Sequence, residues 1–272
     1  PLTGVPKREQ SLVLNFRELS PGGKMGVYRV ARTAEDYTGY RTMKLWVYGG
    51  DGVSEGDSLV AFIRFGADSS NYYEARLPVS PGWRELRVPL VTLTQLKYNV
   101  FQDTSRSPFL DTLGVTLGVR GTPSLSSVRW ISLGVYNFGD QAFSGEVWFD
   151  ELRLDDVCRE PGTALRASIQ AGMGDVLRVQ GEYTGRGEDF KGFGEKGPGG
   201  GEDRSYSFRA DLQLGKLFPE AWGVSIPVGA TFRKRIHLPK FQPGSDIVLP
   251  KDGRWRERSY TNGRTINFSF QM

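Results

Sequence analysis

The adjacent carboxylates Asp150 and Glu151 look like an acid/base pair in this chain of 272 residues. They lie in the strand-like run 145–154, where consecutive side chains point to opposite faces, so they cannot flank one scissile bond. Glu146 could share a face with Asp150, but about 13 Å or more separates the two along an extended strand. The sequence therefore predicts no catalytic residue and no enzyme.

Asp150 could instead help to bind a cation, because calcium takes oxygen ligands from carboxylates and from the backbone carbonyls of several loops. The spacing of the chain fixes no further ligand. We therefore predict at most a structural calcium ion at Asp150 and no other cofactor. A solvated or purely structural carboxylate is the alternative.

Other residues that often carry chemistry lack partners in the sequence. The single histidine, His237, has no nucleophile and acidic orienter near it, and the single cysteine, Cys158, can form no intramolecular disulfide. Together they cannot make the usual Cys/His zinc site. The glycine-rich stretch 191–197 lacks the Gly-Lys-Ser/Thr ending of a phosphate loop.

Tyr72, Tyr73 and Trp83 are aromatic side chains that could stack on a sugar ring. Strand alternation puts Tyr72 and Tyr73 on opposite faces, so at least one should pack in a core. The charge is close to balanced, since residues 1–160 hold 18 basic and 19 acidic side chains (net −1) and residues 161–272 hold 17 and 12 (net +5). We expect no nucleic-acid partner and keep glycan binding as an alternative.

The elements that must position these residues are almost all strands, because short apolar runs alternate with Gly/Pro/Asn/Asp/Ser clusters. Eight strands are predicted in the first half, at 12–16, 25–30, 43–48, 59–65, 72–77, 84–89, 131–136 and 146–154. Residues 97–127 are polar and predict a long irregular connection. This pattern favours a jelly-roll β-sandwich over residues 1–157.

Residues 158–272 contain five segments of polar/apolar alternation, at 165–171, 177–183, 206–214, 224–233 and 265–272. Each segment has one apolar and one polar face. Membrane-spanning β-barrel strands show this pattern, and so does a soluble antiparallel sheet with one buried face, so the pattern alone leaves both open. A glycine-rich loop is predicted at 185–203. No run approaches 18 apolar residues, so no transmembrane helix is predicted.

Three motifs, in order, resemble segments of the SprA/Sov family. The run 145–154 is similar to E-[IV]-W-x-[ND]-E-L-R-L, the run 214–227 to L-G-K-[FL]-F-P-E…G-[VI]-x-[IL]-P, and the run 239–247 to P-K-[YF]-x-P…D-[IV]. The residues that carry the resemblance are Glu146, Trp148, Glu151, Leu152, Arg153, Gly215, Lys216, Phe218, Pro219, Pro227, Pro239, Pro243 and Asp246. The first 140 residues match more loosely, as a galactose-binding-like module. A Thr-Pro-Gly-Phe-Gly-like turn of the family is reduced to residues 192–194.

This resemblance implies a fragment of the large outer-membrane β-barrel translocon of type IX secretion, associated with gliding motility in Bacteroidetes-like bacteria. That family exports folded proteins through its lumen at the cell surface and does no covalent chemistry. The implied fold is all-β: a sandwich, then consecutive antiparallel strands too few to close a barrel. The implied partners are outer-membrane lipid, other translocon subunits and exported proteins.

The resemblance also implies which faces meet lipid and water. Side chains expected to face lipid are Phe208, Leu212, Ile226, Phe232, Phe268 and Phe270. Side chains expected to face the lumen are Arg178, Arg209, Asp211 and Gln213. The alternative function is a soluble carbohydrate-binding module joined to a β-rich domain, which would dissolve without detergent and bind glycans through exposed aromatic side chains.

Overall fold

The computed structural model describes residues 10–54, 56, 58–158, 160–190, 192, 200–242, 245–248 and 260–268. Strands dominate these residues and form three antiparallel sheets, so the predicted all-β class is confirmed. Among the same residues, no helix is long and apolar enough to cross a membrane. The chain forms two compact units, Pro1–Cys158 with Gly244–Ile247, and Arg159–Pro243 with Val248–Met272.

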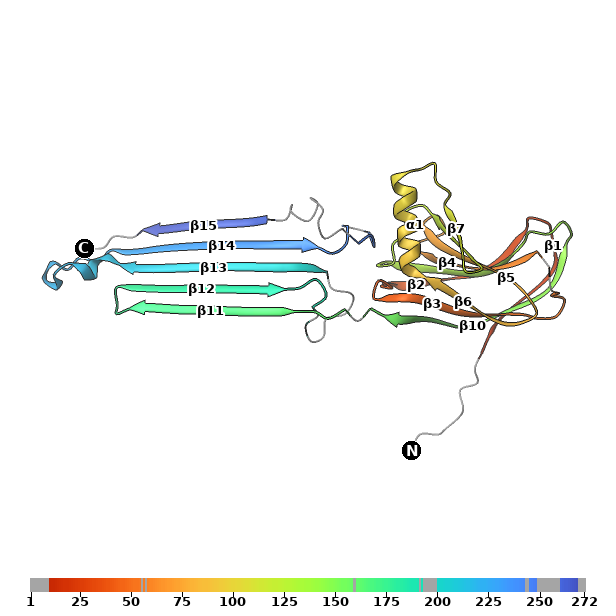
Figure 1. The fold of residues 1–272 in the computed structure, drawn as a ribbon, viewed down its shortest axis with the longest axis horizontal. Helices are drawn as coiled ribbons and strands as arrows, with labels where there is room; N and C mark the ends of the chain where they lie inside the picture. Colours follow the sequence, from red (N-terminus) through yellow and green to blue (C-terminus); the bar gives the residue numbers. More distant parts are fainter. Residues whose placement is uncertain are drawn as a thin grey trace, which may run out of the picture. The chain divides into compact units, whose positions relative to one another are not determined.

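The first unit is a sandwich of two antiparallel sheets (Figure 1). A four-stranded sheet has the order β1-β10-β3-β6 and a six-stranded sheet the order β2-β9-β4-β5-β8-β7. The strands are β1 Leu12–Leu19, β2 Lys24–Glu35, β3 Tyr40–Gly49, β4 Leu59–Gly66, β5 Tyr72–Pro78, β6 Gly82–Pro89, β7 Phe109–Thr112, β8 Val115–Arg120, β9 Val128–Asn137 and β10 Phe143–Val157. All eight strands predicted for the first half are present.

The core of the sandwich collects alternate side chains from both sheets. The four-stranded sheet contributes Leu14, Met43, Leu45, Val47, Leu86 and Val147, and the six-stranded sheet contributes Ile63, Phe65, Tyr73, Ala75, Leu117 and Val135, all buried. Full burial of a side chain of this kind stabilises the fold by about 1.5–3 kcal/mol. Strand alternation is therefore what selects these residues for the core.

The prediction of an irregular connection at 97–127 is wrong. Helix α1 covers Leu90–Gln102, and β7 and β8 follow it. The helix buries Leu90, Leu93, Leu96 and Lys97 on one side and contacts β3 and β8. Its threonine and valine residues have low helix propensity, so packing of this side rather than propensity determines the helix.

The second unit is a five-stranded antiparallel sheet in which each strand pairs with the next along the chain, in the order β11-β12-β13-β14-β15. The strands are β11 Ala164–Met173, β12 Leu177–Arg186, β13 Gly201–Gln213, β14 Pro227–Pro239 and β15 Tyr260–Phe268. Strands thus occur in all five predicted alternating segments, although residues 269–272 of the last segment lie outside the described residues. None of the four pairings contains a register shift. One alternation of faces therefore continues across the whole sheet.

Two predicted boundaries in this unit are wrong. The glycine-rich loop was predicted at 185–203, but Gly185 pairs with Arg204 and Arg186 with Asp203. Ladder hydrogen bonds use backbone groups, so glycine composition does not prevent pairing. The strand predicted from residue 224 begins only at Pro227. The short 3-10 helices Leu214–Leu217 and Glu220–Trp222 precede it, with Gly223 at a φ of 61°.

Candidate functional surfaces

One face of the five-stranded sheet is apolar. Residues directly across from each other on paired strands share a face. Phe208 lies across from Phe232, and Leu212 lies between Leu177 and Val228. The apolar side chains of this face are Leu165, Ala167, Ile169, Ala171, Met173, Leu177, Val179, Tyr183, Tyr206, Phe208, Ala210, Leu212, Val228, Ala230, Phe232 and Ile266. Arg264 lies on the same face, directly across from Phe232, and its guanidinium lies 5.8 Å from the Phe232 ring centroid.

The apolar face is exposed. Ile169 is 69% exposed, Phe208 47% and Ile266 65%. Continuous apolar patches of this kind are rare on soluble monomers and indicate contact with lipid or with another protein. The sheet therefore needs a partner for this face.

Along the strands, aromatic and charged side chains form the border of the apolar face. On β13 the apolar face extends from Leu212 to Tyr206, a length of about 20 Å at about 3.4 Å per residue. Arg204 follows Tyr206 on the same face. The ring centroids of Tyr206 and Tyr183 are 5.0 Å apart. Lys234 lies directly across from Tyr206. This order of apolar, tyrosine and basic side chains is typical of strands that pass from lipid into the interface.

The opposite face is polar and carries ion pairs. Arg178 lies across from Asp211. Arg209 Nε donates to Asp211 Oδ2 at 2.8 Å, and Arg166 Nε donates to Glu182 Oε1 at 2.7 Å. The four residues predicted to face a lumen all lie on this polar face: Arg178, Arg209, Asp211 and Gln213. Their assignment to a lumen stays a prediction.

The predicted lipid-facing residues fall into three groups. Phe208, Leu212 and Phe232 lie on the apolar face. The backbone of Phe268 pairs with that of Val228, and Ile226 lies just before β14, where its carbonyl accepts a hydrogen bond from Leu214 N–H at 2.9 Å. The last, Phe270, lies outside the described residues. That these side chains meet lipid also stays a prediction.

The second motif forms the connection between β13 and β14. Gly215 approaches Val224 so closely that a Cβ at residue 215 would lie 2.3 Å from the carbonyl oxygen of Val224. Phe218 and Trp222 stack with ring centroids 6.1 Å apart and are 43% and 64% exposed. Lys216 and Pro219 lie in the same connection, and Pro227 and Pro239 are the first and last residues of β14. Exposed aromatic side chains at strand ends are characteristic of membrane interfaces.

The first motif contains a β-bulge. Asp150 pairs with Trp46, but Arg153 pairs with Lys44, so β10 holds one extra residue. Glu151 has a φ of 48°, in the left-handed region that non-glycine residues rarely adopt. The simple alternation assumed for 145–154 is therefore wrong between Asp150 and Arg153, because the bulge resets which side chain faces which way.

The carboxylates of this motif make separate local contacts. Glu146 Oε1 accepts from Trp148 Nε1 at 3.1 Å, and Glu151 Oε2 accepts from Arg153 Nη1 at 2.6 Å. Leu152, which lies between Glu151 and Arg153 in the motif, is 40% exposed. Glu146 and Glu151 therefore accept hydrogen bonds from two different donors of the same motif.

Asp150 has two hydrogen-bond donors. Ser11 Oγ donates to Oδ2 at 3.0 Å, and the Glu151 N–H donates to Oδ1 at 2.8 Å. These donors compete with a cation for the same oxygen atoms. Within the described residues, no three His, Cys, Asp or Glu side chains gather in a group that could hold a metal ion. Calcium at Asp150 stays a prediction.

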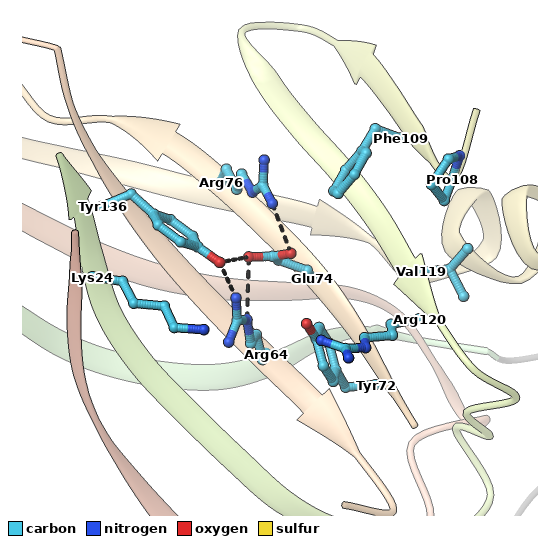
Figure 2. A pocket seen from close by; sticks show the side chains of 10 residues that line it. All are labelled: Lys24, Arg64, Tyr72, Glu74, Arg76, Pro108, Phe109, Val119, Arg120 and Tyr136. Carbon is cyan, nitrogen blue, oxygen red and sulfur yellow. Dashed lines mark hydrogen bonds and ion pairs between the residues drawn. The ribbon is translucent and has the colours of Figure 1, made fainter. Parts of the chain in front are cut away.

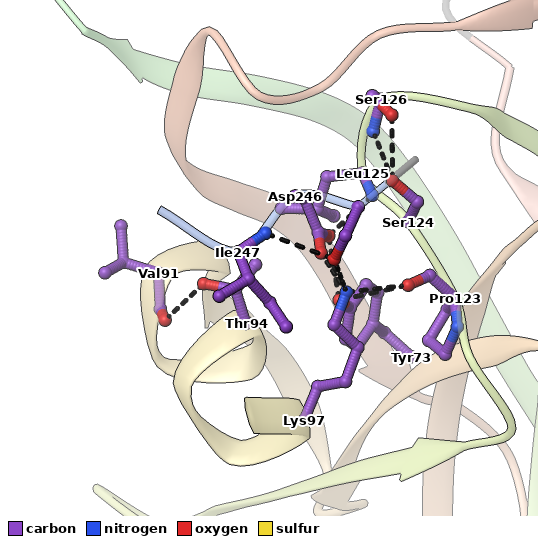
Figure 3. Close-up of polar contacts among 11 residues, drawn as sticks. Tyr73, Val91, Thr94, Lys97, Pro123, Ser124, Leu125, Ser126, Asp246 and Ile247 are labelled. Carbon is purple, nitrogen blue, oxygen red and sulfur yellow. Dashed lines mark hydrogen bonds and ion pairs between the residues drawn. The ribbon is translucent and has the colours of Figure 1, made fainter. Parts of the chain in front are cut away.

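Asp246, from the third motif, lies buried in the sandwich unit (Figure 3). Its carboxylate forms an ion pair with Lys97 Nζ and accepts hydrogen bonds from Tyr73 Oη at 2.8 Å and Leu125 N–H at 2.7 Å. Lys97 Nζ also donates to the carbonyl of Pro123 at 3.0 Å. Burial, and then the charge of Asp246, raise the pKa of Tyr73 far above its usual value.

This cluster was not found by local sequence reasoning. Asp246 is singled out only by the resemblance of the third motif to the SprA/Sov family. Lys97 lies in the stretch 97–127, which was predicted to be irregular. The two are separated by 149 residues, so no local spacing links them. Pro243, of the same motif, lies outside the described residues. A buried carboxylate with three donors is well compensated, whereas removal of one partner would leave a buried charge unpaired.

A pocket of about 340 Å³ lies on the six-stranded sheet (Figure 2). It is lined by Lys24, Arg64, Tyr72, Glu74, Arg76, Pro108, Phe109, Val119, Arg120 and Tyr136. Tyr72 thus faces the pocket and Tyr73 the core, as alternation predicts. Trp83 instead packs on Tyr48 in the four-stranded sheet. The three aromatic side chains therefore do not form one platform.

His237 and Cys158 lie in different parts of the fold and make separate contacts. His237 Nδ1 lies 2.9 Å from Asp203 Oδ1 on the polar face of the five-stranded sheet. Cys158 has a free thiol, and its backbone N–H donates to the carbonyl of Gly39 at 2.8 Å. The register of β13 and β14 thus supplies His237 with an acidic partner 34 residues away in the chain, which was not predicted from the sequence.

Comparison with protein families supports the resemblance of the three motifs. A protein-family model described as a motility-related and secretion protein matches residues 2–252. That range covers the sandwich, β11 to β14 and all three motifs. A search of curated proteins found no match.

Proposed function

The chain belongs to the SprA_N family of motility-related and secretion proteins, and from this premise we propose that it supplies wall strands to an outer-membrane translocon that exports proteins. The sandwich is an appended jelly-roll module on that wall. The protein has no enzymatic role in this proposal. It acts at the bacterial cell surface with lipid, other translocon subunits and exported proteins as partners.

The observation that carries this proposal is the exposed apolar face of the five-stranded sheet. The opposite face of the same strands is polar and ion-paired, so the two faces suit two different environments. A soluble sheet would cover its apolar face, but Ile169, Phe208 and Ile266 are largely exposed. In an outer membrane, acyl chains would cover this face and water would fill the other side.

Strand length and pairing support the proposal. The five strands contain 10, 10, 13, 13 and 9 residues, and a tilted strand needs about 9–11 residues to cross a bilayer. Each strand pairs with its neighbour in sequence, as in up-and-down barrels. Edge strands β11 and β15 each have one unpaired side within the described sheet. Lipid cannot satisfy those backbone groups, so further strands must pair there.

Deletion of residues 217–222 in the complete gene tests the proposal. This change removes the connection between β13 and β14 and should disturb their register, since a slip of one residue inverts every side chain. We expect the medium to lose the organism's exported proteins while other outer-membrane proteins assemble normally. A six-residue deletion at 193–198, in the glycine-rich stretch, serves as the control.

Two outcomes would count against the proposal. Normal export from a correctly folded variant would mean that these strands do not form the translocon wall. Recovery of the wild-type protein in the soluble fraction without detergent would favour the carbohydrate-binding alternative.

A further inference from the structure

We propose that the pocket on the six-stranded sheet binds a small acidic saccharide unit, with the acid group on the cationic side chains and the sugar ring beside Phe109. This site is separate from the proposed role of the five-stranded sheet. It lies on the face of the six-stranded sheet that points away from the sandwich core (Figure 2).

The floor of the pocket contains more positive than negative charge. Glu74 is buried and accepts from Arg64 Nε at 3.2 Å and from Arg76 Nη2 at 3.1 Å. The side chains of Arg64 and Arg76 are only 12% and 20% exposed. One carboxylate therefore compensates two poorly hydrated guanidinium groups. A buried charge without a counter-ion is unfavourable, so the site favours a second anion.

The rim adds two further cations. Lys24 and Arg120 line the pocket, and the described residues provide neither with a carboxylate partner within ion-pair distance. The formal charge of the lining is therefore four cations minus one carboxylate, or +3. A concave site with charge of one sign concentrates ligands of the opposite sign. Guanidinium groups bind carboxylates and phosphates in a planar, two-point geometry.

Within the described part of the chain, one donor of Arg76 lacks a partner. Arg76 Nε is buried and has no hydrogen-bond partner among the described residues. Buried donors in native proteins are nearly always satisfied by protein, water or ligand. Nε itself has almost no accessible surface, so a ligand in the pocket would meet the other nitrogen atoms of this guanidinium group, of which Nη2 donates to Glu74.

The aromatic side chain of Phe109 indicates which kind of molecule bears the acid group. Phe109 is 40% exposed, and the Arg76 guanidinium lies 4.4 Å from its ring centroid. Pro108 lies beside Phe109 in the lining (Figure 2). Gly118 leaves room for this ring, since a Cβ there would lie 2.7 Å from Phe109. An apolar ring next to cations and tyrosine hydroxyls suits a sugar, which has both C–H and O–H surfaces. The volume fits one small ligand.

Titration of the full 272-residue chain with four probes tests the proposal. The probes are D-glucuronate, glucose 6-phosphate, D-glucose and inorganic phosphate. Calorimetry measures the binding of each probe. We expect binding of one or both acidic sugars, weakened by added salt because the contacts are ionic. The tighter of these two identifies carboxylate or phosphate as the acid. Glucose and inorganic phosphate should each bind at least about tenfold more weakly.

Matched variants locate the site. Arg120→Gln and Lys24→Gln each remove one exposed rim cation, and each should weaken binding by about tenfold or more, since a charge-assisted hydrogen bond contributes about that much. Arg129→Gln removes an exposed cation of β9 outside the pocket lining and should leave affinity unchanged.

Four results would overturn the proposal. These are no binding of either acidic sugar, equal binding of glucose, equal binding of inorganic phosphate, or a loss in Arg129→Gln as large as that in Arg120→Gln. Circular dichroism of each variant confirms that the fold is retained before affinities are compared.

Discussion

The sandwich and the five-stranded sheet use the same strand alternation with opposite consequences. In β3 of the sandwich, Met43, Leu45 and Val47 are buried against a second sheet. In β13, Phe208 is 47% exposed, and the described residues of its unit form no second sheet over the apolar face. The difference shows that alternation determines which side chains share a face, whereas what covers that face depends on the surroundings.

Charged groups differ in the same way between the two regions. The sandwich encloses Asp246 with Lys97, and Glu74 with two arginines. The sheet keeps its ion pairs, such as Arg209 with Asp211, at an exposed surface. Buried pairs make stability sensitive to the loss of one partner, while exposed pairs contribute little. The comparison therefore predicts different responses to substitution.

The largest expected effect is in the sandwich. Lys97→Met leaves the buried carboxylate of Asp246 without its cation and should lower the free energy of unfolding by about 3–5 kcal/mol. Adding Asp246→Leu to Lys97→Met should restore part of this loss, because no buried charge then remains. The control Asp103→Asn, in an exposed pair, should change stability little. Denaturant unfolding measures all four proteins; a loss no greater than that of the control would show that the cluster is not buried.

The next effect tests the apolar face. Phe208→Arg should destabilise the lipid-inserted protein by about 2–4 kcal/mol if residue 208 lies near the bilayer midplane. Gln213→Arg, on the polar face, should have a small effect, since that side is hydrated. Unfolding from lipid vesicles measures both. A larger effect of Gln213→Arg would reverse the assignment of faces, and no effect of either would contradict insertion.

A smaller effect concerns alkaline pH. Burial raises the pKa of Tyr73 far above its unfolded value of about 10. The folded state keeps the hydroxyl proton of Tyr73. The contribution of Tyr73 to the free energy of unfolding is therefore complete below about pH 10 and is lost as the pH rises above that value. Unfolding monitored from pH 8 to 12 should show a steep loss for the wild type and a shallower one for Tyr73→Phe. Equal slopes would mean that Tyr73 is not responsible.

The smallest expected effect concerns calcium. The oxygens of Asp150 already accept hydrogen bonds from Ser11 and the Glu151 N–H. Because these hydrogen bonds leave little free coordination at Asp150, the predicted calcium ion should stabilise the protein only slightly, and a chelator should lower the melting temperature by a small amount. A fall that added calcium reverses, and that Asp150→Asn abolishes, would establish a structural ion there.

The strands were predictable because alternation is a local property. All thirteen predicted strands are present as far as the described residues extend, and Arg178 and Asp211, both predicted to face a lumen, lie across from each other on paired strands. Helix α1 was not predicted, because its fold depends on packing against β3 and β8. The extra residue at Glu151 also has no sequence signal as clear as a glycine would give.

The buried sites were less predictable because distant segments form them. Asp246 meets Lys97 across 149 residues. The pocket combines Lys24 of β2, Arg64 of β4, Arg76 of β5 and Arg120 of β8, and these strands become neighbours only through the sheet order. Basic residues scattered along the chain give no local indication that they share one pocket.

Site-directed spin labelling on adjacent residues tests the central claim most directly. The complete gene product is first prepared with every cysteine, Cys158 included, replaced by serine. The variants Phe208→Cys and Arg209→Cys then each place one nitroxide on one face of β13, and the proteins are studied in outer-membrane vesicles. The account predicts that the label at 208 is accessible to oxygen dissolved in lipid and that the label at 209 is accessible to a water-soluble relaxation agent. Equal accessibility of both labels to the water-soluble agent would contradict a membrane-spanning wall.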